Sequence, residues 1–348
     1  MRKSLLMPVT LVSLSFGVAT LALANPLDRA GSIRGQKPAP SRPAAAQPAG
    51  PIPDQGVHNA VHAAHQNQIV FTRIDTTVGG ITEADIVRDF TLGQPMFFRV
   101  YMERSAVNAI AAATGMPASA VYADGVHYTA RFTIDGQTFD TTMFPWGNPR
   151  DHQTWTTWRG QFINPGTAQR TPGSDAFFEM LSRATSAGLL KPGKHTIKME
   201  LIAKTNTEKA GPISAGVVAS GTFNLTVPAG IFSPSNTTIC GARRGGAGSA
   251  AMEARALSEA KRISRNPELV PVRAIGIGES WDVERNAVTG IPIERETYVL
   301  IQSRGPKFCT SNTHSFYEDY MGGGSFSTAT GSISVNMRVG YVPCGCLP

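Results

Sequence analysis

The sequence lacks the motifs that most often identify an enzyme from one chain. No G-x-S-x-G or H-E-x-x-H motif and no Cys/His pair at usable spacing occurs in the 348 residues. The Gly-rich stretch 321–324 has no following Lys and no strand–loop–helix order, so it is not a phosphate loop. Positive residues are scattered, without interleaved aromatic residues, and nucleic-acid binding is therefore not indicated despite the net charge of +7. We expect no cofactor, no metal and no catalytic residue.

Long apolar runs are also absent, except at the start of the chain. Arg2 and Lys3 precede an apolar stretch over 5–23 that ends in Ala22-Leu23-Ala24. A basic start, an apolar centre and small residues before the cleavage point are typical of a secretory signal peptide. Pro8 and other interruptions make a membrane anchor the weaker alternative. Residues 1–24 are thus predicted to be removed after Ala24, which would leave a periplasmic or extracellular protein with no transmembrane span.

Cysteine is scarce, with four residues in the chain: Cys240, Cys309, Cys344 and Cys346. In an exported protein an even number of cysteines usually forms disulfides. We expect Cys309 to pair with Cys344 or Cys346, which leaves Cys240 for the remaining thiol. A metal site at Cys344-Gly345-Cys346 is disfavoured because no second ligand pair has the spacing that such a site needs.

Charged residues make up only 16% of the chain, whereas apolar residues make up 41% and can form cores. The 35 Gly and 24 Pro residues favour turn-rich β structure, and the length favours two domains. The composition predicts a Pro/Ala-rich disordered linker over 25–66, a β domain over 67–228, a second linker or hinge over 229–248, and a final module over 249–348.

Residues 194–203 have the clearest strand pattern of the β domain. Ile197, Met199 and Leu201 alternate with more polar residues, as in a half-buried strand. Residues 126–144 predict a hairpin around Asp135-Gly136, a pair that accepts positive φ. Six or seven such strands with short turns predict a β-sandwich of immunoglobulin-like type.

Two further patterns in this domain give expectations about orientation and helix ends. Residues 89–103 are expected to form one long strand, with Phe98, Val100 and Met102 inward and Phe97, Arg99, Tyr101 and Glu103 outward. A short helix is expected to begin with Ser174 as its N-cap and to end at Gly188.

The final module is predicted to be a small α+β unit, with one helix packed on an antiparallel sheet. The helix over 250–264 is capped by Ser249 and carries a small apolar stripe that includes Met252 and Ala256. Strands are expected over 269–278, 280–285, 291–303, 309–320 and 331–343.

Residues 144–162 hold most of the candidate ligand-binding side chains: Trp146, His152, Trp155 and Trp158. Either these Trp rings close the end of a core, or some of them stand exposed and stack on a sugar or peptide. Tyr317 and Tyr320, interpreted as part of a solvated loop, are further candidates. His58, His62 and His65 have helical spacing, but no carboxylate or cysteine follows to complete a metal site, and they are interpreted as a polar segment before the first strand.

These observations favour an exported, non-enzymatic binding or scaffold protein of a bacterial-type cell envelope, whose partner is an unknown envelope protein or polysaccharide. The alternative is a hydrolase of an envelope polymer. Carboxylates such as Glu284 and Asp319 would then divide acid and base roles in a cleft between the domains. Glu318 and Asp319 are sequence neighbours, so on a strand they would point to opposite faces.

Overall fold

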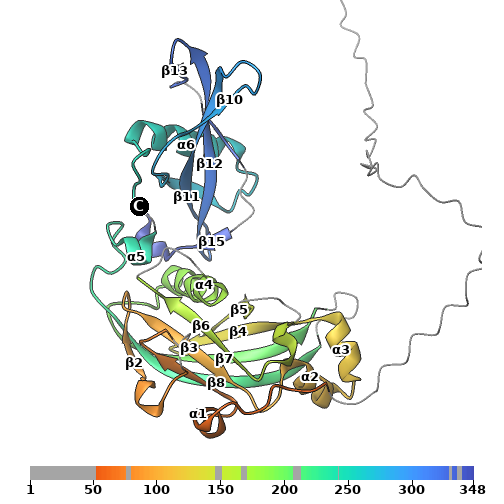
Figure 1. The fold of residues 1–348 in the computed structure, drawn as a ribbon. Coiled ribbons are helices and arrows are strands. Elements are labelled where there is room, and N and C mark those ends of the chain that lie inside the picture. Colours follow the sequence, from red (N-terminus) through yellow and green to blue (C-terminus); the bar gives the residue numbers. More distant parts are fainter. Residues whose placement is uncertain are drawn as a thin grey trace, which may run out of the picture. The chain divides into compact units, whose positions relative to one another are not determined.

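The protein is mainly β: in the computed structural model, strands make up 41% and helices 24% of the described residues, and the strands form two curled sheets (Figure 1). The structure describes residues 52–75, 80–145, 151–165, 171–206, 213–241, 243–328, 331–334 and 339–348. The predicted signal peptide, most of the predicted linker 25–66 and Trp146 lie outside these residues. Among the described residues, every helix is too short or too polar to cross a membrane.

The first sheet contains eight strands from the N-terminal part of the chain. In spatial order they are β5 (Gln137–Met143), β4 (Val126–Ile134), β7 (Gly193–Thr205), β8 (Ser214–Val227), β1 (Gln68–Thr72), β3 (Met96–Tyr101) and β6 (Thr157–Ile163), with β2 (Asp89–Thr91) on β8. β1 and β2 run parallel to β8, and the remaining pairs are antiparallel.

Two strand predictions for this sheet are confirmed. Residues 194–203 lie in β7, between β4 and β8, and Ile197, Met199 and Leu201 are fully buried. β4 and β5 form the predicted hairpin, with φ of 48° at Asp135 and 85° at Gly136. Both the apolar alternation and the turn chemistry are local features, which is why the sequence shows them.

Helix α4 (Pro172–Ser186) packs against the first sheet, and the sheet curls around it (Figure 1). Phe177 of α4 stacks on Phe162 of β6, with ring centroids 4.6 Å apart, and meets Phe132 of β4 edge to face. Burying an aromatic side chain of this size stabilises the fold by roughly 2–3 kcal/mol. The predicted immunoglobulin-like sandwich is not confirmed, because the eight strands form one hydrogen-bonded sheet and a helix packs where a facing sheet was expected.

The ends of α4 show how its sequence sets its limits. The Thr171 side chain accepts a hydrogen bond from the Ser174 backbone N–H, and Pro172 occupies the first turn. Thr171 is therefore the N-cap, and the prediction of Ser174 was wrong by one turn. The predicted end is confirmed, since Gly188 follows the last helical residues with a φ of 72°.

Residues 89–103 form two strands, not the single predicted strand. Gly93, with a φ of 97°, and Pro95 separate β2 from β3. Phe98 and Val100 are buried as expected, but Phe97 and Tyr101, predicted to face outward, are also buried. The second face of β1 and β3 is covered as well: Tyr101 clusters with Val61, which lies on α1 (Ala60–Ala64) within the range predicted as linker.

The other helices of this part of the chain are short. They are η1 (Glu83–Asp85), α2 (Ala106–Thr114), α3 (Ala118–Asp124), η2 (Asp151–Thr154) and α5 (Thr237–Cys240). Ser105 caps α2 by accepting from the Asn108 N–H, and Gly115 ends it in the left-handed conformation.

The second sheet contains seven strands from the C-terminal part of the chain. They are β9 (Val270–Gly276), β10 (Asp282–Arg285), β11 (Pro292–Arg304), β12 (Cys309–Gly322), β13 (Ser325–Phe326), β14 (Ser332–Ile333) and β15 (Val339–Tyr341). β11 and β12 form its long central pair. β9 and β10 both pair with β11, whereas β13, β14 and β15 pair with β12. The predicted strand 331–343 is present as β14 and β15, and residues 335–338 between them lie outside the described part of the chain.

Helix α6 (Ala250–Ile263) begins as the sequence predicts, with the Ser249 hydroxyl accepting from the Met252 N–H at 3.2 Å. Its buried residues Met252, Ala256 and Ala260 form a cluster with strand residues of the second sheet: Ala274, Val299, Ile301, Phe316 and Ile333. Small side chains on the helix allow its backbone to approach the larger strand residues closely.

Two disulfides join the start of β12 and the segment at α5 to the C-terminal turn η3 (Cys344–Cys346). Cys309 pairs with Cys344, which is one of the two pairings that the sequence left open, and Cys240 pairs with Cys346. All four cysteines are buried in the same cluster as the core of the first sheet. Ser182 of α4 accepts from the Cys309 N–H at 2.6 Å, so this helix holds the start of β12.

Candidate functional site

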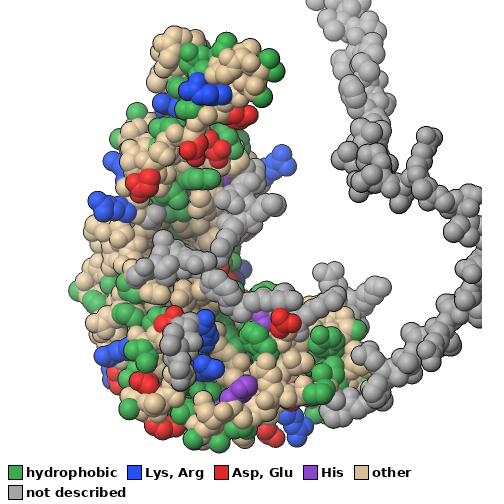
Figure 2. Space-filling view, viewed as in Figure 1, with side chains coloured by type: hydrophobic (Ala, Val, Ile, Leu, Met, Phe, Trp, Pro, Cys, Tyr) green, Lys and Arg blue, Asp and Glu red, His purple; other side chains and the backbone are tan. Residues whose placement is uncertain are grey.

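The end of the second sheet that includes β10 and β13 has the most distinctive surface among the described residues. We call this end the arm and define it as residues 281–296 and 317–326, which include β10, the first part of β11, the last part of β12 and β13. In Figure 1 it lies at the end marked by β10 and β13, and in Figure 2 hydrophobic side chains reach the surface there. One face of the arm points toward α6 and the other points away from it.

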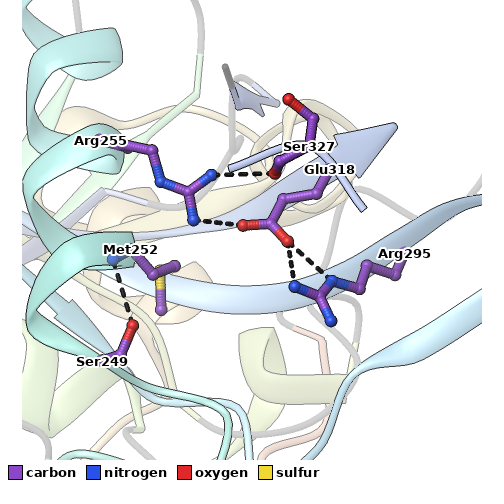
Figure 3. A network of polar contacts seen from close by, with 6 residues as sticks. All are labelled: Ser249, Met252, Arg255, Arg295, Glu318 and Ser327. Carbon is purple, nitrogen blue, oxygen red and sulfur yellow. Dashed lines mark hydrogen bonds and ion pairs between the residues drawn. The ribbon is translucent and has the colours of Figure 1, made fainter. Parts of the chain in front are cut away.

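On the face toward α6, Glu318 forms a buried ion-pair network (Figure 3). The Glu318 side chain has no exposed surface. Its Oε1 accepts from Nη2 of Arg255 on α6, and its Oε2 accepts from Nε and Nη2 of Arg295 on β11, the Nε bond being 2.7 Å long. Arg255 also donates to the backbone oxygen of Ser327.

Aromatic rings surround the two guanidinium groups. The Arg295 Cζ lies 4.2 Å from the ring centroid of Trp281 and 4.6 Å from that of Phe326, so the cation is held between two ring faces. The Arg255 Cζ lies 5.5 Å from the ring centroid of Phe316. These contacts tie Trp281, which directly precedes β10, to β11 and β13. Both carboxylate oxygens of Glu318 therefore accept hydrogen bonds from guanidinium groups.

The opposite face of the arm is acidic. Residues directly opposite one another on antiparallel strands share a face, and the register therefore gives one row of Glu284, Glu294 and Asp319 across β10, β11 and β12. The next row is Asp282, Glu296 and Tyr317. Five carboxylates thus lie on three neighbouring strands.

Glu294 lies in the middle of the first acidic row, and its pKa is raised. Partial burial is the largest cause, followed by the charge of Glu284 and a hydrogen bond with that carboxyl, and then by Asp319 and Glu296. Like charges directly opposite one another in a sheet destabilise it. This row therefore costs folding free energy at neutral pH.

Exposed apolar side chains lie at the edge and tip of the arm. Val283 of β10 and Ile293 of β11 are 40% and 48% exposed. Val288, in the turn between these strands, is 93% exposed, and Met321 at the end of β12 is 70% exposed. The Val288 turn is ordered, since the Asn286 side chain accepts from the N–H groups of Val288 and Thr289 at 3.0 Å each.

The structure brings together candidate residues that the sequence placed in two separate turns. Glu284 and Asp319 flank Glu294 on the acidic face, although 34 positions separate them in the chain. The interpretation of Tyr317 and Tyr320 as loop residues was wrong, because both lie in β12, which matches the strand expected over 309–320. The expectation that Glu318 and Asp319 face opposite sides is confirmed, since the former is buried and the latter exposed.

The other candidate binding residues lie in the N-terminal part of the chain and away from the arm in sequence. Trp158 is buried in β6 against Phe98 and Tyr128. His152 is buried and packs on the half-buried Trp155, with ring centroids 4.7 Å apart. This burial favours the interpretation of these rings as core.

The three histidines that precede β1 do not share a metal site. His62 is fully buried, bonds the Met102 backbone oxygen at 3.1 Å and packs on Tyr101. His65 pairs instead with Glu83, 3.0 Å away. Within the described ranges, no group of three His, Cys, Asp or Glu side chains is placed to hold a metal ion.

Sequence reasoning did not find Arg255, Arg295 or Glu294 as members of this site. A local signal existed for part of it: the D-V-E of 282–284 and the E-R-E of 294–296 both place acidic residues two apart, as on one face of a strand. No local signal connects Arg255 to Glu318, which lies 63 residues further along the chain.

No protein-family model matches this chain, and searches of curated proteins and of solved structures returned no similar protein.

Proposed function

We propose that this chain is an exported, non-enzymatic binding or scaffold protein of a bacterial-type cell envelope, and that it contacts its partner through the arm. The observation that carries the proposal is the group of exposed apolar side chains at the edge and tip of the arm, with Val288 93% and Met321 70% exposed. Exposed apolar patches that polar residues surround are typical of interaction surfaces.

The proposal includes removal of residues 1–24 after Ala24 and export to the periplasm or the cell exterior. Two disulfides support this, since such bonds persist in oxidising compartments. It also includes a final module over 249–348 organised as an α+β unit with α6 on its sheet, joined to the first domain through 229–248. The packing of Met252, Ala256 and Ala260 on strand residues supports this organisation.

The proposal is tested by retention of the protein on its native envelope fraction. Replacing Val288 and Met321 by Ser removes apolar surface without touching a buried side chain, and we expect retention to fall at least fivefold. Val217→Ser, at a residue that is 49% exposed on β8 of the first sheet, is the matched control. Unchanged retention of the double variant would exclude the arm as the contact surface. Trp158→Ala is unsuitable for this purpose, because it would leave a cavity in the core.

A second candidate function is hydrolysis of an envelope polymer by the acidic row. The raised pKa of Glu294 beside Glu284 favours it, since neighbouring carboxyls with separated pKa values can act as acid and base. In that case Glu294→Gln would abolish polymer cleavage and leave envelope retention intact. Absence of cleavage by the unaltered protein over a range of pH would exclude this candidate.

A further inference from the structure

β10 is the end strand of the second sheet. It pairs with β11 on one side, and no strand of the described residues pairs with it on the other. All four of its residues are exposed. An end strand presents backbone N–H and C=O groups that can hydrogen-bond to an added strand.

The side chains along this edge differ sharply between the two faces. Asp282 and Glu284 point to the acidic face, with Glu294 and Glu296 directly behind them on β11. Val283 points to the other face, where it lies opposite Arg295 of β11, and Trp281 and Ile293 add apolar surface there. An added strand also alternates its side chains between the two faces, so one set of its residues would meet carboxylates and the other set would meet apolar groups.

The charge on this edge favours a basic segment over a second copy of the chain. In the edge-to-edge register that sets Val283 opposite Val283, two copies of β10 would bring Asp282 of each copy against Glu284 of the other, and cross-strand like charges are destabilising. A basic segment would instead relieve the repulsion among the carboxylates. Native proteins use charge at sheet edges in this way to exclude wrong partners while admitting the right one.

We propose that β10 accepts an extended segment of a partner protein by strand addition, and that this segment alternates Lys or Arg with apolar residues. The inference rests on the proposed function, because it names the class of partner that the arm binds. Basic side chains of the added strand lie over Asp282, Glu284 and the carboxylates behind them. Its apolar side chains lie against Val283 and Ile293.

The test uses the full chain and a fluorescent, end-capped peptide of three Lys-Val repeats, with binding followed by fluorescence anisotropy at low and high salt. Two further peptides separate the contribution of charge from that of backbone hydrogen bonding. One is a Glu-Val repeat, and the other is the Lys-Val repeat with alternate backbone nitrogens methylated. Methylation keeps the charge but removes the N–H groups that a strand needs. The protein variants are Asp282→Lys with Glu284→Lys, and Glu268→Lys as the control at an exposed position outside the arm.

We expect the Lys-Val peptide to bind, the double variant and the methylated peptide each to weaken binding at least tenfold, and Glu268→Lys to change it less than twofold. Salt should weaken binding, since the paired charges are near the surface. Equal binding of the methylated peptide would overturn strand addition and leave simple charge attraction. Undetectable binding of the Lys-Val peptide, or equal binding by the double variant, would also overturn the proposal. Circular dichroism shows whether each variant is folded.

Envelope retention of the same double variant separates this inference from the proposed function. If the double variant loses retention but the unaltered protein does not bind the Lys-Val peptide, the strand-addition partner is overturned and the arm remains the contact surface. Retention unchanged in this variant and in Val288→Ser with Met321→Ser would overturn both.

Discussion

At the scale of single residues, Glu318 holds the second sheet and α6 together. Its buried carboxylate is bonded to Arg255 on the helix and to Arg295 on β11. Removing one member of a buried ion-pair network leaves its partners without compensation, at a cost of about 3–5 kcal/mol when they are fully buried. Here the arginine side chains keep 20% and 27% exposure, which lowers that cost.

We expect Glu318→Gln to lower the free energy of unfolding by about 2–3 kcal/mol, because the neutral amide leaves two guanidinium groups facing each other. Equilibrium unfolding in urea measures this. Glu268→Gln, at an exposed position of the same module, is the control and should change the value by less than about 0.5 kcal/mol. A loss below that limit for Glu318→Gln would show that the network contributes nothing to stability.

Two histidines near α1 give opposite pH dependence. Burial lowers the pKa of His62, and the neighbouring His58 lowers it further, against a hydrogen bond to the Met102 carbonyl oxygen that raises it. Its contribution to stability is therefore present above the unfolded value near 6.5 and is lost as the pH falls toward the folded pKa. Hydrogen bonds to Gln68 and Glu83 raise the pKa of His65. Its contribution is present below about 6.5 and is lost as the pH rises through the folded pKa.

Unfolding free energies between pH 5 and pH 7.5 separate the two histidines. We expect His62→Gln to flatten the rise of stability with pH, and His65→Gln to make that rise steeper. Each substitution changes the slope of the unfolding free energy against pH by at most about 1.4 kcal/mol per pH unit. The same sign of change in both variants would contradict the opposite pKa shifts.

At the scale of elements, the β4–β5 hairpin depends on two residues with positive φ. No heavy atom lies within 4 Å of the position that a Cβ would take at Gly136. The cost of a side chain there therefore comes from the backbone conformation and not from a clash. A β-branched residue is penalised most in this region of φ and ψ.

We expect Gly136→Val to lower the free energy of unfolding by about 1–3 kcal/mol. Gly136→Asn should cost clearly less, because Asn tolerates the left-handed region. Thermal unfolding of the two variants side by side gives the comparison. Equal losses of unfolding free energy in the two variants would mean that the turn relaxes to another conformation and that the Asp135-Gly136 pair does not determine the hairpin.

At the scale of the whole molecule, the two disulfides close loops of very different length. Cys309–Cys344 spans 35 residues and Cys240–Cys346 spans 106. The longer loop restricts the unfolded chain more, and the loop-entropy relation gives about 4 kcal/mol for the shorter bridge and about 5 kcal/mol for the longer.

Replacing each cysteine pair by Ala in turn should therefore destabilise the protein in both cases, with the Cys240–Cys346 pair costing about 1 kcal/mol more. Urea unfolding under non-reducing conditions measures the difference. Thiol labelling of each variant before unfolding confirms that the other bridge has formed. A larger loss from the shorter bridge would mean that native packing at α4, and not chain entropy, sets the cost.

Much of the secondary structure could be predicted because its signals are local. Alternation marks β7, the Asp135-Gly136 pair marks the hairpin, and Ser249 marks the start of α6. The wrong predictions concern features that depend on how the elements pack or on a choice between two similar residues. Tyr101 was expected to face solvent, yet it is buried because α1 covers that face of β3. The N-cap of α4 was misplaced because Thr171 and Ser174 are both good capping residues.

The sequence alone determined β7, the β4–β5 hairpin and the start of α6, and it restricted the cysteine pairing, since periodicity, turn chemistry and spacing act over a few residues. Only the tertiary structure decided that β10 and β12 both flank β11, which unites Glu284 with Asp319 and buries Glu318 between two arginines. The physical reason is that strand neighbours and the covering of each face depend on the packing of distant segments, which no local pattern records.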